Sequence, residues 1–287
     1  MDRRIIELYD EYTHKPLERR VFLRRLAALT GSTAGAFAVL PMLENNYAQA
    51  AIVDPGDSRV SAGMINYPGV SGGLRAYLAT PTSGPAKRAG VIVIHENRGL
   101  NAHIEDIARR IAVAGFTALA PDLLSPLGGT PPDEDTARSL IARVDRVVAV
   151  RDLVAAIPYL KSRPDSNGKV GAVGFCWGGE MTNQLAAHAP DLDGAVPFYG
   201  PVPSADDAAK IKASLMLHYA GNDSRVNTGV PGYEAALKAA GVPYELHMYD
   251  NVEHAFNNDT NAGRYNKAAA DLAWSRTVAF LKKHLGG

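Results

Sequence analysis

The stretch Lys169-Val-Gly-Ala-Val-Gly-Phe-Cys-Trp-Gly-Gly179 decides the fold. Its first half is an apolar run typical of a strand that is covered on both faces. The run ends at a glycine-rich turn around Cys176, and a helical pattern begins directly after this turn. A buried strand that turns sharply into a helix is a unit of a parallel α/β sheet. Cys176 stands where the pattern G-x-S-x-G has its serine, so the turn predicts a nucleophilic thiol.

Glycines surround this cysteine for a physical reason. A nucleophile at such a turn needs neighbours without a Cβ at Gly174 and Gly178, so that the strand and helix backbones can approach. The start of the helix also favours a thiolate. The alternative is a small buried hydrophobe, the usual role of a free cysteine, but the glycines favour the nucleophile. Residues 69–73 match G-x-S-x-G formally, yet no helix follows them, and they are interpreted as a hairpin turn.

From residue 51 onward, the chain alternates strand patterns with helical periodicity. We therefore predict an α/β fold with a mostly parallel, eight-stranded sheet and helices on both faces. No linker divides residues 51–287, which are expected to form a single domain. The first two strands should form an antiparallel hairpin at one edge. Strands are predicted at 60–67, 74–79, 91–95, 117–120, 170–175, 195–199, 215–219 and 244–249, and helices near 104–111, 140–160 (one or two), 178–187, 233–240 and 264–284.

Two later loops supply an acid and a base. Asp223 lies 47 residues after Cys176 and follows the predicted strand 215–219, whereas His254 follows the predicted strand 244–249. α/β-Hydrolases carry their triad in the order nucleophile, acid, histidine. Asp223 and His254 are therefore the candidate acid and base. The weaker alternatives are the acids Asp193, Asp206, Asp207, Asp250 and Glu253 and the strand histidines His218 and His247.

The loop after the strand 91–95 should complete the site. In this arrangement the oxyanion is held by the backbone N–H after the nucleophile and by a second N–H from this loop. We assign these two donors to Trp177 and Asn97. Preorganised donors of this kind contribute about 3 kcal/mol each to transition-state stabilisation.

Several motifs together resemble the dienelactone hydrolase (carboxymethylenebutenolidase-like) family of α/β-hydrolases. They are His95-Glu-Asn-Arg-Gly99, Ala120-Pro-Asp-Leu123, Ser166-Asn-Gly-Lys-Val-Gly171 with the cysteine turn, Gly221-Asn-Asp223 and His254-Ala-Phe256. The resemblance implies a Cys176–His254–Asp223 triad, an acyl-enzyme intermediate and no metal or organic cofactor. It also implies that Glu96 hydrogen-bonds the resting thiol, although a salt bridge from Glu96 to Arg98 or a buried loop acid is the alternative.

This sequence departs from the family at two substrate-binding positions. Family members that act on dienelactone are expected to hold its carboxylate with two arginines, and the corresponding positions here are Pro126 and Asn258. Neither side chain carries a positive charge. Arg98 is a possible substitute anion binder, and its alternative interpretation is a solvated surface charge.

Composition restricts the class of protein further. The 30 Lys and Arg residues balance 30 Asp and Glu residues, so the chain lacks the basic surface that nucleic-acid binding requires. Cys176 is the only cysteine, which excludes an internal disulfide and a zinc site made of several cysteines.

Residues 1–50 resemble a signal for export. Glu18-Arg-Arg-Val-Phe-Leu-Arg-Arg25 is similar to the twin-arginine signature, and an apolar run follows it at 26–43. Ala48-Gln-Ala50 provides the small residues that signal peptidase needs. We expect recognition by the twin-arginine export machinery, cleavage after Ala50 and a periplasmic or secreted mature protein without a stable membrane anchor. The alternatives are an uncleaved anchor or an ordinary amphipathic helix.

The expected function is hydrolysis of a small ester or lactone through Cys176. Two other functions are weighed against it: a catalytically silent scaffold that binds a ligand, and a redox-reactive thiol, which the missing second cysteine disfavours. A nucleotide-binding oxidoreductase is disfavoured because no G-x-G-x-x-G follows an early strand.

Overall fold

The computed structural model describes residues 1–15, 17–47 and 51–286. Its centre is one eight-stranded sheet with the order β1-β2-β4-β3-β5-β6-β7-β8. The pairs among β3 to β8 are parallel, whereas β2 is antiparallel to both β1 and β4. The strands are β1 Val60–Gly69, β2 Gly72–Pro81, β3 Arg88–Ile94, β4 Thr117–Pro121, β5 Ser166–Phe175, β6 Gly194–Phe198, β7 Ser214–Ala220 and β8 Tyr244–Tyr249.

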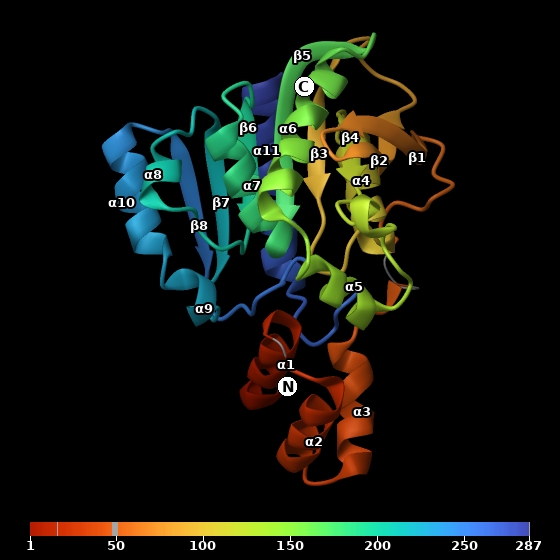
Figure 1. Cartoon of the computed structure of the whole chain (residues 1–287), viewed down its shortest axis with the longest axis vertical. Coiled ribbons are helices and arrows are strands. Elements are labelled where there is room, and N and C mark those ends of the chain that lie inside the picture. Colours follow the sequence, from red (N-terminus) through yellow and green to blue (C-terminus); the bar gives the residue numbers. More distant parts are fainter. Residues whose placement is uncertain (16, 48–50, 287) are drawn as a thin grey trace.

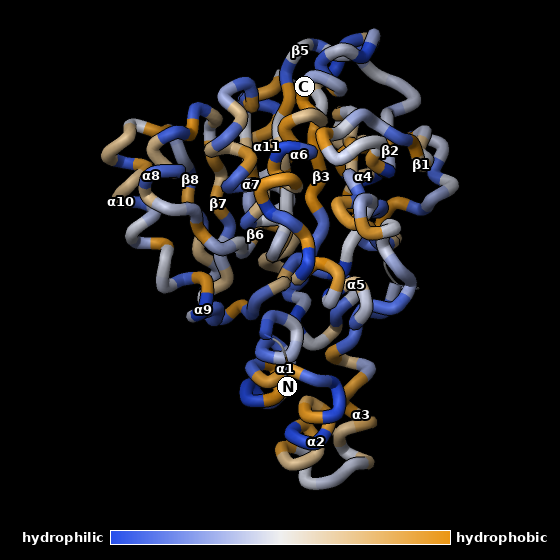
Figure 2. The backbone as a smooth tube through the Cα atoms, in the orientation of Figure 1, coloured by the Kyte–Doolittle hydropathy of each residue, from blue (hydrophilic) through white to orange (hydrophobic). Residues whose placement is uncertain are grey.

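All eight predicted strands and the predicted edge hairpin are confirmed. Gly69 and Gly72 face each other where β1 turns into β2, and Gly72 has φ +114°, a conformation that favours glycine. The G-x-S-x-G pattern at 69–73 is therefore a hairpin turn, as predicted. In β3, β4 and β6 every side chain except that of Arg88 is buried, which explains their continuous apolar runs, and β3 is orange along much of its length in Figure 2.

Helices cover both faces of the sheet. α6 and α7 contact each other and lie in front of the sheet in Figure 1, whereas α11 lies behind it and packs on β5, β6 and β7. The bounds are α4 Ala102–Val113, η2 Ser125–Leu127, α5 Glu134–Ile141, α6 Arg146–Lys161, α7 Trp177–His188, α8 Ala205–Ala208, α9 Ser224–Asn227, α10 Val230–Ala240 and α11 Lys267–Leu285.

The pattern predicted over 140–160 is two helices. The Asp145 side chain accepts hydrogen bonds from the backbone N–H groups of Val147 and Val148, so α6 begins with its own N-cap after α5 has ended at Ile141.

Three further helices precede the sheet. α1 (Arg3–His14), α2 (Arg19–Thr30) and α3 (Thr33–Leu43) enclose a small apolar core of their own, which includes Tyr9, Tyr12, Phe22 and Leu26. Figure 1 shows them below the carboxyl ends of the parallel strands. Among the described residues, no single helix is long and apolar enough to cross a membrane, and the pair α2 and α3 passes that test only together, with a 111° bend.

The segment that holds α1, α2 and α3 docks onto the sheet domain through polar contacts. The Tyr12 hydroxyl donates to Asp135 of α5 (2.6 Å), and the Asn97 side chain donates to the Thr13 carbonyl (2.8 Å). Arg19, the first residue of the predicted twin-arginine pair, forms ion pairs with Glu44 and Asp135. Removal of this segment on export stays a prediction, and the predicted cleavage site at Ala50 lies outside the described residues.

Candidate active site

Cys176 lies at the tight turn between β5 and α7. Its backbone has φ +55° and ψ −114°, which is a strained conformation for a residue with a side chain. The Cys176 N–H donates to the Phe198 carbonyl of the neighbouring strand (3.0 Å), which anchors the turn to the sheet. The thiol is buried with 5 % of the residue exposed, at the carboxyl end of the sheet and the start of α7.

The glycines around the turn are needed for close backbone approach. A Cβ on Gly174 would collide with the Gly178 carbonyl and the Thr182 hydroxyl, and one on Gly178 would collide with the carbonyl oxygens of Ile94 and His95. The end of β3 thus packs directly against the first turn of α7. The spacing that identified the turn in the sequence is therefore required by the contact between these elements.

The structure brings the predicted acid and base together. The His254 Nδ1–H donates to Asp223 Oδ2 at 2.5 Å, and both side chains are almost fully buried. Asp223 also caps α9, because its Oδ1 accepts the N–H of Val226 (3.2 Å). With Nδ1 engaged, His254 presents Nε2 toward the sulfur of Cys176, and the donor atoms of the two residues lie within 4.8 Å of each other.

The charges in this cluster favour a thiolate and an imidazolium. Burial raises the pKa of the Cys176 thiol, but adjacent His14 and His254 lower it more strongly, to about 5. Burial lowers the pKa of His254, while Asp223 and the thiolate raise it to about 10. Burial raises the pKa of Asp223, and His254 lowers it to about 2.

A second imidazole from the N-terminal segment also reaches the sulfur. His14, the last residue of α1, places Nε2 at 3.3 Å from Cys176 Sγ. Its ring stands edge-on to that of His254, with centroids 4.8 Å apart. The same helix places Asp10 at 3.0 Å from the guanidinium of Arg264, which is buried beside the site. α1 therefore covers the cysteine on the side opposite the sheet.

The predicted oxyanion donors belong to loops that meet at Cys176. Trp177 is the first residue of α7, so its N–H has no acceptor within that helix. Asn97 follows β3 and borders the same cavity as Trp177 and Cys176. The His95 ring stacks on the Trp177 indole, with ring centroids 5.4 Å apart, so the loop after β3 packs against the start of α7. Within that loop, His95 Nδ1 donates to the Glu96 carbonyl (2.7 Å).

Glu96 is buried next to the site but is held by a different partner than expected. Its Oε2 accepts a hydrogen bond from the Asn258 side chain (2.8 Å), and its Oε1 has no hydrogen-bond partner among the described residues. Glu96 borders the same small space as Cys176 and His254, so a hydrogen bond from the thiol to this carboxylate stays a prediction. The position that would carry a family arginine, Asn258, thus orients Glu96.

Arg98 is buried and already ion-paired. Its guanidinium lies 3.6 Å from Glu134 and 3.8 Å from Asp135, and only 5 % of the side chain is exposed. The alternative of a solvated surface charge is therefore wrong, and so is a salt bridge to Glu96. Anion binding by Arg98 stays a prediction, and it would require Arg98 to leave both carboxylates. Pro126, at the other family arginine position, lies in the short helix η2.

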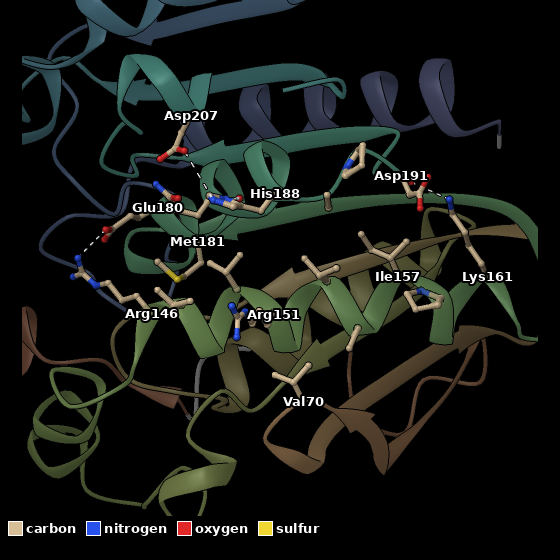
Figure 3. Close-up of a pocket in the computed structure, with 18 residues that line it drawn as sticks. Val70, Arg146, Arg151, Ile157, Lys161, Glu180, Met181, His188, Asp191 and Asp207 are labelled. Carbon is tan, nitrogen blue, oxygen red and sulfur yellow. Dashed lines mark hydrogen bonds and ion pairs between the residues drawn. The ribbon is translucent and has the colours of Figure 1, made fainter. Parts of the chain in front are cut away.

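A cavity of about 1010 Å³ opens beside the sulfur, bordered by His14, Asn97, Trp177 and Arg225. A second cavity, of about 1040 Å³, runs along α6 and α7, as Figure 3 shows. Arg146 and Glu180 form an ion pair (3.0 Å) that borders both cavities. None of the predicted site residues is among the described residues that line the second cavity, so the first cavity is the candidate substrate site.

Sequence reasoning missed the contribution of the N-terminal segment. His14 and Asp10 were assigned to a signal and were not considered as parts of the site. One feature of the sequence could have revealed their role: α1 has an apolar face, on which Tyr9, Tyr12 and Thr13 are all nearly inaccessible in the structure. An amphipathic helix of that kind needs a partner surface. Arg264 carries no motif and was also missed.

A residue at a strained turn between a strand and a helix, with an acid and a histidine on later loops of a mostly parallel sheet, is the arrangement of the α/β-hydrolase class. The family model of the dienelactone hydrolase family matches residues 74–285, and the chain belongs to that family. The protein is therefore a hydrolase.

Known proteins are similar over most of the sheet domain. A relative from Saccharolobus solfataricus named "Putative carboxymethylenebutenolidase" is 34 % identical over 73 % of this chain and 94 % of its own length. "Protein usf" of Aquifex pyrophilus is 38 % identical over 74 % of this chain and 94 % of its own. The crystal structure of a dienelactone hydrolase-like promiscuous phosphotriesterase, P91, from metagenomic libraries has 26 % identity and a TM-score of 0.72, and it covers 80 % of this chain and 100 % of its own.

Proposed function

We propose that the protein hydrolyses a small carboxylic ester or lactone through a covalent intermediate on Cys176. The observation that carries this proposal is the geometry of one cluster: a thiol at a strained turn, a histidine facing it, and that histidine bonded to Asp223 at 2.5 Å. Nucleophile, base and orienting carboxylate in this relation are the requirements for acyl transfer. Family membership and relatives named as carboxymethylenebutenolidases support the same substrate class.

The reaction divides into two steps. The Cys176 thiolate attacks the carbonyl carbon, and the N–H groups of Trp177 and Asn97 stabilise the oxyanion. The intermediate collapses as the carbon–oxygen bond of the leaving group breaks, and His254 donates its Nε2 proton to that oxygen. Water then attacks the thioester while His254 accepts its proton, which releases the acid and restores the thiolate and imidazolium.

Cations on the cavity wall define the substrate class further. Arg225 lies 4.0 Å from Asp223 and borders the cavity together with Lys15. The two family arginine positions carry Pro126 and Asn258, which have no charge. We therefore expect neutral short esters and lactones to be turned over better than dienelactone, because the two arginines expected to hold its single carboxylate are absent.

Hydrolysis by the purified full-length chain tests the proposal. A panel of short aryl esters, small lactones and one aryl phosphotriester should show ester or lactone turnover. Cys176→Ala should lose that turnover, whereas Ser71→Ala, in the hairpin that only imitates the motif, should retain it. Full activity of Cys176→Ala would assign the chemistry to another residue. An acyl adduct on Cys176, trapped for mass spectrometry, would exclude a silent scaffold.

Export through the twin-arginine route is proposed separately, on the motif at Arg19 and Arg20. Processing of the chain to a mature N-terminus at Ala51 in the periplasm is expected. Changing both arginines to lysine should leave the full-length precursor unprocessed. Normal processing of that variant would contradict this route.

A further inference from the structure

Three strong metal-donor groups meet at the buried sulfur. Cys176 Sγ and one ring nitrogen each of His14 and His254 all lie within 4.8 Å of one another. They come from the end of α1, the turn before α7 and the loop after β8, so only the docked N-terminal segment brings all three together. A thiolate with two imidazoles is a donor set that suits Zn²⁺ and related borderline metals.

We propose that His14, Cys176 and His254 form a binding site for Zn²⁺ that holds the hydrolase in an inactive state. The ion would take the thiolate of Cys176 and the Nε2 lone pairs of both histidines. The protons on Nε2 of both histidines leave to solvent when the ion binds. The fourth position opens toward the cavity, which leaves room for a water ligand.

The spacing of the donors fits a tetrahedral ion after small side-chain movements. Zn–S bonds of about 2.3 Å and Zn–N bonds of about 2.0 Å place tetrahedral ligands about 3.3–3.6 Å apart. His14 Nε2 and Cys176 Sγ are already 3.3 Å apart. The widest separation in the cluster, 4.8 Å, exceeds that range by little more than 1 Å, which rotation of an imidazole can close.

Both histidines are oriented as metal ligands usually are. His14 Nδ1 lies 2.9 Å from the Asp10 carbonyl oxygen, and His254 Nδ1 donates to the Asp223 carboxylate. Each ring therefore directs Nε2 at the sulfur, which is how a second set of partners fixes a ligating imidazole. His254 Nε2 has no hydrogen-bond partner among the described residues, although only 2 % of its side chain is exposed.

Carboxylates around the cluster favour a cation. Asp10 lies 3.9 Å from the His14 ring, Asp223 is bonded to His254, and Glu96 borders the same small space with one free oxygen. Arg264 and Arg225 oppose them. Arg98 borders the same space but is already paired with Glu134 and Asp135. With the thiolate counted, four negative groups face the two remaining guanidinium groups, so a divalent cation balances the site.

Cobalt is the probe for this site, because a thiolate bound to Co²⁺ gives a charge-transfer band in the near ultraviolet. The full-length chain, kept reduced and metal-free, is titrated with Co²⁺ and then with Zn²⁺ as competitor. One equivalent of Co²⁺ should produce the band, and Zn²⁺ should abolish it. Cys176→Ala should give no band.

His14→Gln separates a metal ligand from a hydrogen-bond donor. Glutamine can still donate to the thiolate but is a poor ligand for zinc, so the Co²⁺ affinity should fall at least about tenfold. The matched control is His188→Ala, an exposed histidine of α7, which should bind as the parent does. No band in the parent, or equal affinity in His14→Gln and the parent, would overturn the proposed site.

The inhibitory effect rests on the proposed function and is measured separately. Zn²⁺ should stop ester hydrolysis by the parent at concentrations that saturate the cobalt site, and a chelator should restore it. His14→Gln should need at least about tenfold more Zn²⁺ for the same inhibition. A cobalt band without any hydrolysis would support the metal site and refute the proposed function. Hydrolysis that persists with the site full of Zn²⁺ would refute the inhibition.

Discussion

Two imidazoles, from opposite ends of the chain, act on one sulfur. His254 is paired with Asp223, and His14 is positioned by the last turn of α1, so the thiolate is stabilised from both sides. Opposite charges close to a buried group outweigh its desolvation when they are this near. The charge state of Cys176 is therefore a property of the whole cluster.

The reactivity of Cys176 should depend on pH with a low midpoint. The thiolate is the form that reacts, and its fraction rises as the pH passes through the pKa of about 5. Alkylation by iodoacetamide should thus rise through pH 5 and be near its plateau at neutral pH. His254→Gln should move the midpoint upward, because it removes one stabilising charge. A parent midpoint near that of a free thiol, about 8.5, would contradict the ion pair.

Asp223→Asn should leave the fold intact and remove most of the activity. An amide cannot stabilise the imidazolium of His254 or hold the same tautomer, and the corresponding change in a serine triad lowers kcat about 10⁴-fold. A loss of about 10³–10⁴-fold in kcat is expected from steady-state kinetics. Asp250→Asn, at an exposed acid close to His254 in the sequence, is the matched control and should retain activity. Comparable losses in both variants would argue against Asp223 as the orienting acid.

At the scale of elements, the strands were the most predictable part. Each strand is a short apolar run bounded by turn residues. The parallel strands are buried on both faces, so the sequence need not show which face points to the core. The order of Cys176, Asp223 and His254 could be predicted because each follows a strand end. The break between α5 and α6 could not be predicted from the sequence, because one apolar periodicity continues through both helices across Asp145. The role of α1 depends on docking over a long sequence distance, which local patterns do not encode.

Gly178→Ala should destabilise the protein at the junction of β3 and α7. The new Cβ would meet the carbonyl oxygens of Ile94 and His95, which belong to backbone that cannot retreat. Overpacking of this kind costs about 1–3 kcal/mol in the free energy of unfolding, measured by urea denaturation. Gly232→Ala, in the exposed α10 with no atom near the new Cβ, should instead gain up to about 1 kcal/mol. Equal free energies of unfolding for Gly178→Ala and the parent would show that the backbone at this junction moves to make room for the new Cβ.

At the scale of the whole molecule, the N-terminal helices cover the site. A chain that starts at Ala51 lacks α1 and should react faster with iodoacetamide and with aryl esters. A rise of at least about tenfold is expected, which corresponds to only about 1.4 kcal/mol of docking free energy. Tyr12→Phe, which loses the bond to Asp135, should show a smaller rise in the full chain, and Arg3→Ala, on the exposed face of α1, should show none. A folded short chain that reacts no faster would contradict a covering role.

The contact between Asp10 and Arg264 spans 254 residues, and that between His14 and Cys176 spans 162. A ribosome makes the N-terminal end first, so α1 emerges long before any of its docking partners exist. The covering helix therefore stays undocked during synthesis and settles on the site only after Arg264, in the last tenth of the chain, has been made. Completion of the hydrolase and covering of Cys176 by α1 thus become the same event in time.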